Sequence, residues 1–532
     1  MPTWGSVKNR SDYPEWLKAW DTECNAMKKL GVLEECDEPY GKPVAGSTLV
    51  CKIKRLWNGT IDKYRVRWVL QGFSQTYGVN FFDTSSPVIQ GAVVRLVACI
   101  MTVTNCVALQ CDVSVAYLRS ELHEELWMYP PKGTPPLPPN PKNGKRRCYR
   151  VKRAIYGCKQ GSIEWFKTFS KKQFLQNGYR QCPFDTCLFI KRSGIFFCIA
   201  ANYVDDTFVI SNWPEELAAF KTSMRDNFEV TEFNDIKWFL GWHFERDRKA
   251  GTCTISQKQF VLDALQRFGL DDKHARKQPC PTGHVFEELD DTCLLNPARQ
   301  KLLMEKIGTL NYLSTSSRSD ISWVVSKLGM YMQQGDEHTM KITDQVFAYL
   351  KGTADHGITI HRSAGLEPVA FSDASHADNG KTSNGRRRSQ SGGVVKVAGI
   401  GIVCYSRAQK NVCLSTMESE YVALSMAVQE VVWVRRLLFF LGFPPKKPTI
   451  VYEDNEAAQA LANNELMTKR SRFVDARFHF TREMVSEGEV QILRCPTKEM
   501  EADLFTKALS ADLATKFWNR IRGKTFSPLV QA

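Results

Sequence analysis

The sequence predicts a multidomain protein of the mixed α+β and α/β class. At 532 residues the chain is long enough for roughly two to four domains. Segments with the alternation of strands and segments with helical spacing both occur along its length, and acidic residues recur where a predicted strand ends. With 43% hydrophobic and 24% charged residues and no low-complexity tract, the composition is that of a globular protein.

The formal net charge is +14, which favours polyanionic partners and salt-dependent binding. Charge alone would fit a ribosomal or a membrane-surface protein equally well. The seventeen cysteines form no C-x-x-C pair and no Cys/His cluster with zinc-site spacing. Together with the lack of a signal peptide, they indicate a reducing compartment, and we expect neither disulfides nor zinc.

The first candidate site is the acidic pair Asp205 and Asp206. It lies between residues 195–201 and 207–210, which are rich in β-branched and aromatic residues and are predicted to form the two strands of a hairpin. Two adjacent carboxylates repel one another unless a cation lies between them, and a hard dication with oxygen ligands is the usual cation. The pair is therefore a candidate metal site in a turn.

The alternative for this pair is a solvated turn. The chain contains further Asp pairs at 271–272 and 290–291, whose polar surroundings are typical of ordinary surface. The apolar strand on each side distinguishes Asp205 and Asp206 from them. On these residues alone both interpretations stay open.

A third acid supports the metal site. Residues 93–109 are predicted to form a buried helix followed by a strand, and Asp112 falls at the end of that strand. Arg95 and Asn105 interrupt the apolar stretch too often for it to span a membrane.

Three motifs resemble, in order and spacing, the palm motifs of a copia-type (Pseudoviridae) LTR retrotransposon Pol: residues 109–118 around Asp112, residues 154–160, and residues 203–206. The resemblance implies a right-hand polymerase with fingers, palm and thumb, then a helical connection and an RNase H-like domain. The boundaries it implies are 1–40 for an N-terminal helical segment, 41–280 for the reverse transcriptase, 281–365 for a linker and the connection, 366–510 for RNase H and 511–532 for a C-terminal tail.

Residues 1–40 carry apolar positions three or four apart and are predicted to form a packing helix. Residues 47–72 alternate like a hairpin with its turn at Asn58-Gly59. The resemblance implies that this basic hairpin holds the incoming triphosphate, with Lys54 and Arg67 as the candidate contacts. The alternative is a solvated strand edge.

Two more nucleotide-binding candidates rest on the resemblance. Tyr117 would lie under the sugar of the incoming nucleotide and exclude a 2′-hydroxyl. The alternative is that Tyr117 is an ordinary aromatic residue of the hydrophobic core. Gln160 would belong to a loop that faces template and nucleotide. Directly after it the family commonly has Ala-Pro-Arg and this chain has Gly-Ser-Ile at 161–163, so an expected arginine contact is missing.

Further along, residues 256–269 are predicted to form a helix that begins after Ser256, ends at Gly269 and resembles the start of a thumb. Residues 275–297 form a polar linker, and residues 301–352 are helical and resemble the connection.

After residue 366 the pattern predicts three strands, a helix, a strand, a helix, a strand and a final helix. Acids at strand ends and at a helix start can converge and hold two Mg²⁺ for phosphodiester hydrolysis. The segment resembles the RNase H domain of copia-type elements. The acids assigned to this site are Asp373, Glu420, Asp454 and Asp503.

Glu418 competes with Glu420, because helical geometry does not separate the roles of two positions on the same turn; the resemblance favours Glu420. Two departures from the family lie at residues 387–393 and at Phe473, where a histidine is usual. His479 is retained, but a lone histidine is more often structural and it is not assigned to the site.

The resemblance therefore implies an RNA-directed DNA polymerase with RNase H activity. Each site would use two Mg²⁺, with Mn²⁺ as an alternative, and Asp112, Asp205 and Asp206 would hold them in the palm. The expected partners are an RNA template, a DNA primer, the RNA–DNA hybrid and dNTPs, with other Pol products of the same element as further candidates, and no membrane. The family works in cytoplasmic virus-like particles and its product enters the nucleus.

Two rival functions stay open. The chain could be a catalytically silent remnant that only binds nucleic acid, although all seven carboxylates are retained. It could also be a cellular polymerase, telomerase-like or intron-encoded, but these lack an appended RNase H.

Overall fold

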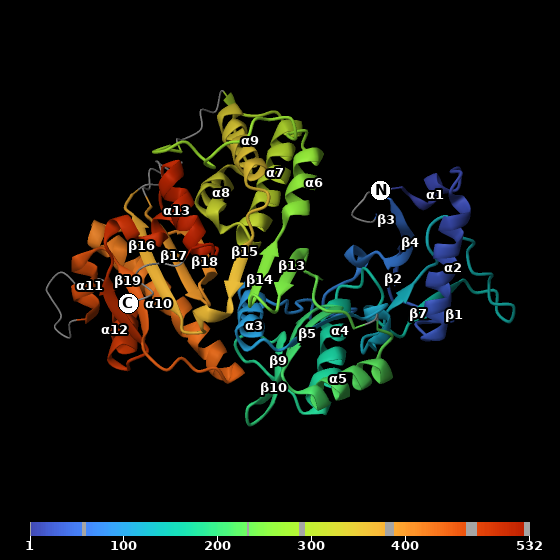
Figure 1. Cartoon of the computed structure of the whole chain (residues 1–532). Helices are drawn as coiled ribbons and strands as arrows, with labels where there is room; N and C mark the ends of the chain where they lie inside the picture. The colour runs from blue at the N-terminus through green and yellow to red at the C-terminus, as the bar shows by residue number, and fades with distance from the viewer. Residues whose placement is uncertain are drawn as a thin grey trace.

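Helices and sheets alternate along the whole chain, so the predicted mixed fold class is confirmed (Figure 1). The computed structural model describes residues 2–55, 60–230, 233–286, 293–377, 388–463 and 476–525. None of the helices in these segments is both long and apolar enough to cross a membrane. The seventeen cysteines are free thiols, and most of them are buried.

The N-terminal part is built on helix α2 (Tyr13–Lys29), which packs against the antiparallel hairpin of β3 (Ser47–Arg55) and β4 (Ile61–Leu70). The predicted spacing is confirmed, because Trp16 and Met27 lie on the buried face of the helix. The predicted turn at Asn58-Gly59 lies outside the described residues. The remaining elements here are α1 (Trp4–Val7) and a sheet in the order β1-β7-β6-β2, formed by β1 (Leu33–Asp37), β2 (Val44–Ala45), β6 (Trp127–Met128) and β7 (Arg147–Val151).

A five-stranded sheet in the order β5-β11-β10-β9-β8 forms the centre of the molecule. The predicted buried helix followed by a strand is confirmed as α3 and β5, and α3 lies on the sheet with almost every side chain buried. The bounds are α3 (Gly91–Thr104), β5 (Val107–Asp112), α4 (Gly161–Phe169), β8 (Arg180–Gln181), β9 (Leu188–Ser193), β10 (Phe196–Tyr203), β11 (Asp206–Ser211) and α5 (Pro214–Asn227).

Another four-stranded sheet and a group of helices follow. Helix α6 (Lys258–Arg267) begins after Gln257, since the predicted start residue Ser256 is still the last residue of a strand. Gly269 adopts φ +63° just beyond the helix, the left-handed conformation that ends helices and that glycine tolerates. The other elements are β12 (Trp238–Phe239), β13 (Trp242–Asp247), β14 (Thr252–Ser256), α7 (Pro297–Ser316), α8 (Ser322–Leu328), α9 (Glu337–Gly352) and β15 (Ile358–His361), with sheet order β12-β13-β14-β15.

The C-terminal part is a five-stranded sheet in the order β18-β17-β16-β19-β20, whose pairing changes from antiparallel to parallel at β16. Helix α10 packs across it. Residues 501–507, which we expected in the final helix, instead begin with a short 3-10 helix at Glu501–Phe505, and the final helix lies at Ala511–Ile521. The bounds are β16 (Val369–Ser375), β17 (Gln390–Val397), β18 (Ile400–Ala408), α10 (Thr416–Leu441), β19 (Thr449–Glu453), α11 (Glu456–Asn463), α12 (Ala476–Ser486), β20 (Val490–Arg494) and α13 (Ala511–Ile521).

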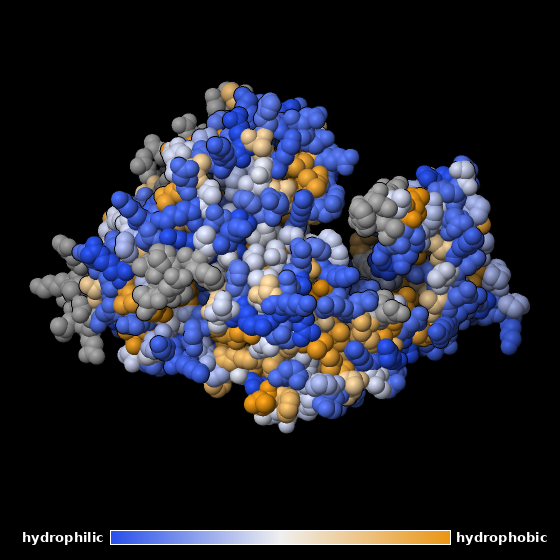
Figure 2. Space-filling view, viewed as in Figure 1, coloured by the Kyte–Doolittle hydropathy of each residue, from blue (hydrophilic) through white to orange (hydrophobic). Residues whose placement is uncertain are grey.

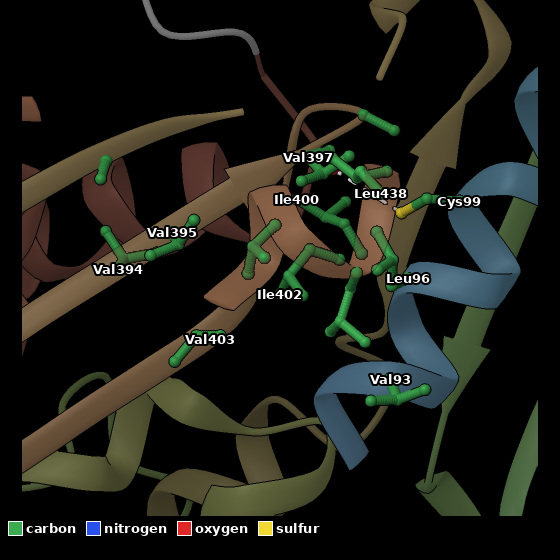
Figure 3. Packing of buried hydrophobic residues seen from close by; sticks show 14 of the residues in the cluster. Val93, Leu96, Cys99, Val394, Val395, Val397, Ile400, Ile402, Val403 and Leu438 are labelled. Carbon is green, nitrogen blue, oxygen red and sulfur yellow. Dashed lines mark hydrogen bonds between the residues drawn. The ribbon is translucent and has the colours of Figure 1, made fainter. Parts of the chain in front are cut away.

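One hydrophobic core runs from the central sheet into the C-terminal sheet. Figure 3 shows Leu96 and Cys99 of α3 beside Ile400 and Ile402 of β18, with Leu438 of α10 behind them. These side chains are all fully buried. The two sheets are therefore joined by one continuous buried apolar core.

Candidate active sites

The turn between β10 and β11 is held in place from two sides. Val204 adopts φ +55°, a left-handed conformation that costs energy in a β-branched residue. The indole Nε1 of Trp165 donates to the carbonyl oxygen of Val204 at 2.6 Å, and the amide of Val113 donates to that of Asp205 at 2.8 Å. The predicted hairpin turn is confirmed, and its neighbours maintain the strained conformation.

Asp112 and Asp206 are directly opposite one another in the β5–β11 ladder, so their side chains share a face. Burial raises the pKa of Asp206 to about 7, and the charges of Asp112 and Asp205 add to the rise. Its Oδ1 is buried without a hydrogen-bond partner among the described residues. Within the described chain these three acids do not each bring an oxygen within 4.8 Å of the others, so they are close enough to repel but not gathered.

The basic hairpin lies beside this acidic pair. Burial and the charge of Asp205 raise the pKa of Asp112, whereas the cations Lys54, Arg65 and Lys63 act against this rise. Lys54 is therefore placed near the acids, as the prediction required. Lys63 and Arg65 were missed, although basic residues at every second position of one strand indicate a charged face.

Arg67 and Tyr117 are linked through Tyr156, which belongs to the same predicted loop as Gln160. The guanidinium of Arg67 lies 4.0 Å from the ring centre of Tyr156, and the rings of Tyr156 and Tyr117 meet edge to face at 5.3 Å. Burial raises the pKa of Tyr117, and the charge of Asp205 adds to the rise. The half-buried Tyr117 thus lies between the basic hairpin and the acidic turn.

Gln160 is placed differently from the other nucleotide-binding candidates. Its side chain is 1% exposed, with Oε1 accepting from Gln75 Nε2 at 2.9 Å and Nε2 donating to the Asn80 carbonyl at 2.7 Å. Both ends of the amide are therefore occupied in holding loops together. A nucleotide contact would first have to break these bonds, and Gln160 is not part of the site described here.

In the C-terminal part, Asp373, Glu420 and Asp454 form a carboxylate cluster. Each offers one oxygen, these oxygens lie within 4.8 Å of one another, and no other such group occurs in the part of the chain that the structure describes. Strand β16 supplies the first acid, the start of α10 the second, and the residue after β19 the third. Three carboxylate oxygens in one place are the donor set that a hard dication prefers, so the residues fit Mg²⁺.

Burial strongly raises pKa values in and around this cluster. It raises the pKa of Glu420 to about 9, and the charges of Asp373 and Asp454 add to the rise. It also raises the pKa of Asp503 to about 7. Glu453 was missed by the sequence analysis: it is 0% exposed, burial raises its pKa well above the usual range, and its Oε2 has no described partner.

The cap of helix α10 distinguishes the surroundings of Glu418 from those of Glu420. Ser415 Oγ accepts from the amide of Glu418 at 3.2 Å, and Glu418 Oε2 accepts from the amide of Leu414 at 2.7 Å. Glu418 thus closes the start of α10 in the manner of a capping box, while Glu420 joins the cluster. The Ser-x-x-Glu pattern that predicts this is present in the sequence.

Asp503 is linked to the cluster by the ammonium group of Lys507. Lys507 Nζ lies 2.6 Å from Asp503 Oδ1 and 3.3 Å from Asp373 Oδ1, while Thr506 Oγ1 donates to Asp373 Oδ2. The ammonium therefore neutralises part of the charge that a metal ion would meet. The spacing of four residues between Asp503 and Lys507 is a usual helical ion-pair spacing, but it says nothing of Asp373.

The metal-free protein is expected to lose stability as the pH rises from about 5 to about 9. The pKa of Asp503 moves from 3.8 to about 7 and that of Glu420 from 4.5 to about 9, so the folded state binds more protons than the unfolded state in this window. Calorimetric melting in EDTA should give a falling transition temperature. Glu420→Gln should flatten this slope, and an equally steep slope in the variant would contradict the assignment.

Lys507→Met is expected to tighten Mg²⁺ binding by roughly tenfold, because it removes a positive charge beside the ligands. Isothermal titration of Mg²⁺ into the folded protein measures this. Lys516→Met is the matched control, since Lys516 Nζ also pairs with an acid, Glu499 at 2.8 Å, but away from the cluster. Unchanged affinity in Lys507→Met would contradict the idea that the ammonium opposes the metal.

Comparisons with known proteins identify a matching family profile and similar proteins. The sequence profile described as "Reverse transcriptase (RNA-dependent DNA polymerase)" matches residues 32–282. The chain is 27% identical over 520 residues to the "Retrovirus-related Pol polyprotein from transposon TNT 1-94" of Nicotiana tabacum, covering 95% of this chain and 38% of that protein. It is 29% identical over 507 residues to the corresponding polyprotein from transposon RE2 of Arabidopsis thaliana, covering 95% and 34%.

The chain thus spans about a third of the length of these curated relatives. Among solved structures, a foamy viral protease-reverse transcriptase in complex with double-stranded DNA is similar at a TM-score of 0.47 and 12% identity. That similarity covers 90% of this chain and 69% of the viral one.

Proposed function

The chain belongs to the copia-type reverse transcriptases, and on this basis we propose that it is an RNA-directed DNA polymerase with a second site that cleaves RNA in an RNA–DNA hybrid. The observation that carries the polymerase is the pairing of Asp112 with Asp206 beside a basic hairpin. The observation that carries the RNA-cleaving site is the carboxylate cluster around Asp373.

In the polymerase site, Asp112, Asp205 and Asp206 would hold the metal ions. Lys54 and Arg67 would bind the triphosphate of the incoming dNTP, since cations that reach several oxygens suit that ligand. Tyr117 would limit the space beside the sugar. Burial raises the pKa of Asp206 to about 7, and the charges of Asp112 and Asp205 add to this rise, so a bound cation would favour the ionised carboxylates.

In the RNA-cleaving site, Asp373, Glu420 and Asp454 would hold a metal ion directly, and Asp503 would complete the set once Lys507 moves. Bound in either site, Mg²⁺ would activate the attacking oxygen and stabilise the charge that develops on the phosphate. The hybrid would be recognised by its shape and 2′-hydroxyls more than by its sequence.

We propose that the nucleic acid follows a hollow of the surface. Figure 2 shows the molecule hollowed between the group of helices that contains α6 and the N-terminal hairpin β3–β4. The net charge of +14 suits a polyanion there. We place the RNA template and DNA primer in this hollow, with the basic hairpin on one side.

The test is incorporation of dTTP on poly(rA)/oligo(dT) with Mg²⁺, followed by release of labelled RNA from the hybrid. Both activities are expected from the folded chain. Salt-dependent binding of the hybrid without incorporation or release would instead support the silent remnant. Residues 161–163, which replace the usual Ala-Pro-Arg, would then be the first to restore.

A further inference from the structure

Arg95 is a buried cation in the middle of the molecule. It lies on α3, beneath the central sheet, and is 7% exposed. Burial lowers its pKa, and its guanidinium lies 5.7 Å from the ring centre of Trp242. A charge in such a place is maintained only where polar groups surround it.

The groups that surround it come from two other parts of the chain. Nε and Nη2 both donate to the Ile402 carbonyl of β18, at 3.0 and 2.8 Å. Nη1 donates to the carbonyls of Ser316 at 2.5 Å and Thr315 at 3.2 Å, at the end of α7. The last carbonyls of a helix lack partners and carry partial negative charge, so they are favourable acceptors for a cation.

Arg95 thus joins α3 of the central part, α7 of the middle helices and β18 of the C-terminal sheet at one point. A planar guanidinium with five donors in fixed directions can do this, whereas a lysine ammonium cannot reach the same carbonyls in one geometry. The apolar contacts around it are those of Figure 3, where α3 faces β18.

A second arginine makes a similar contact on another side of the interface. Arg192 Nη1 of β9 donates to the Leu441 carbonyl at the end of α10 at 3.0 Å. Nearby, the rings of Phe197 and Phe443 meet edge to face at 5.4 Å. The C-terminal sheet and its helix are therefore attached to the central part at two separate places.

We propose that Arg95 is a positioning residue that fixes the distance between the two active sites, and so sets how many base pairs behind the primer terminus the RNA is cut. This inference rests on the proposed function. Without the guanidinium, the carbonyls of Ile402, Ser316 and Thr315 lose this donor and the three parts can shift against one another. Both reactions would then continue, but the RNA would no longer be cut at a fixed distance from the primer terminus.

The test uses Arg95→Met, which retains the length of the side chain and removes its donors. A recessed DNA primer is annealed to RNA labelled at one end, and the cut positions are mapped relative to the primer terminus. Wild-type protein is expected to give one dominant position. In Arg95→Met the share of cuts at that position should fall severalfold and spread to its neighbours, with total cleavage and dTTP incorporation retained.

Arg318→Met is the matched control. Arg318 is buried to a similar degree, at 2% exposure, but it bonds to Asp320 and Thr353 within its own group of helices. Its loss should lower stability without moving the cut positions. Unchanged positions in folded Arg95→Met, equal spreading in both variants, or a wild type without a dominant position would each overturn the proposal.

Two further measurements cover other outcomes. Should Arg95→Met not fold, Arg192→Met loosens the same interface at its other contact and is expected to spread the cuts as well. Should the wild type show no cleavage, the proposed function fails. Amide hydrogen exchange then tests only whether Arg95 holds α3, α7 and β18 together. Faster amide exchange is then expected in Arg95→Met both at the end of α7 and in β18. Protection equal to wild type at either place would show that Arg95 does not hold these elements together.

Discussion

Asp205→Asn is expected to lower dTTP incorporation by at least about a thousandfold, because in the proposed site it would remove a charge that holds the metal ions at the reacting phosphate. Asparagine has nearly the same shape, and the turn is held by the main-chain carbonyls of Val204 and Asp205, which the substitution leaves in place. The fold should therefore be retained. RNA cleavage should remain within about twofold of wild type, since the residues of the other site are untouched.

Asp272→Asn is the control for this substitution. It alters an acid in another Asp pair, but residues 271 and 272 are exposed and polar in their surroundings. Incorporation should not change. If Asp205→Asn polymerises as well as wild type, the turn is only a surface turn and the metal assignment of the central sheet fails.

The second large effect is expected from Asp373→Asn, which should lower RNA cleavage by about a thousandfold and leave dTTP incorporation unchanged. Asp373 is the acid on which the cluster depends: it is 1% exposed, it lies within 4.8 Å of the ligand oxygens of Glu420 and Asp454, and it contacts Lys507. Release of labelled RNA from a hybrid measures the effect. If Asp373→Asn cleaves RNA as well as wild type, the carboxylate cluster is not the site of RNA cleavage.

Glu418→Gln gives the matched comparison on the same helix. Glu418 caps the start of α10, so its loss is expected to cost about 1 kcal/mol of stability and to leave cleavage intact. Glu420→Gln should behave like Asp373→Asn. The reverse result would show that the two glutamates are assigned the wrong way round.

Local patterns predicted much of the fold and of both sites. The hairpin around Asp205, the strand that ends at Asp112 and the packing helix around Trp16 each depend on neighbours close in sequence, and all three are found. The acids at the ends of β16 and β19 also converge as predicted, because both strands run in the same direction in one sheet.

Two features that the sequence did not predict come from contact between distant parts of the chain. Gln160 is buried because Gln75 and Asn80, far away in sequence, occupy its amide. The reach of Lys507 to Asp373 likewise spans distant segments. Neither contact leaves a periodic trace in the sequence. Glu418 is different, because the Ser-x-x-Glu pattern that predicts its role as a helix cap is present in the sequence.

The shared core between the central and C-terminal sheets bears on how such a protein can change over generations. Leu96 of α3 and Ile402 of β18 bury one another, so each half covers an apolar face of the other. A genetic exchange that brought in only one half from a distant element would mismatch that face and expose it to water. Substitutions on one of these faces are therefore expected to be tolerated best when the facing residues change with them.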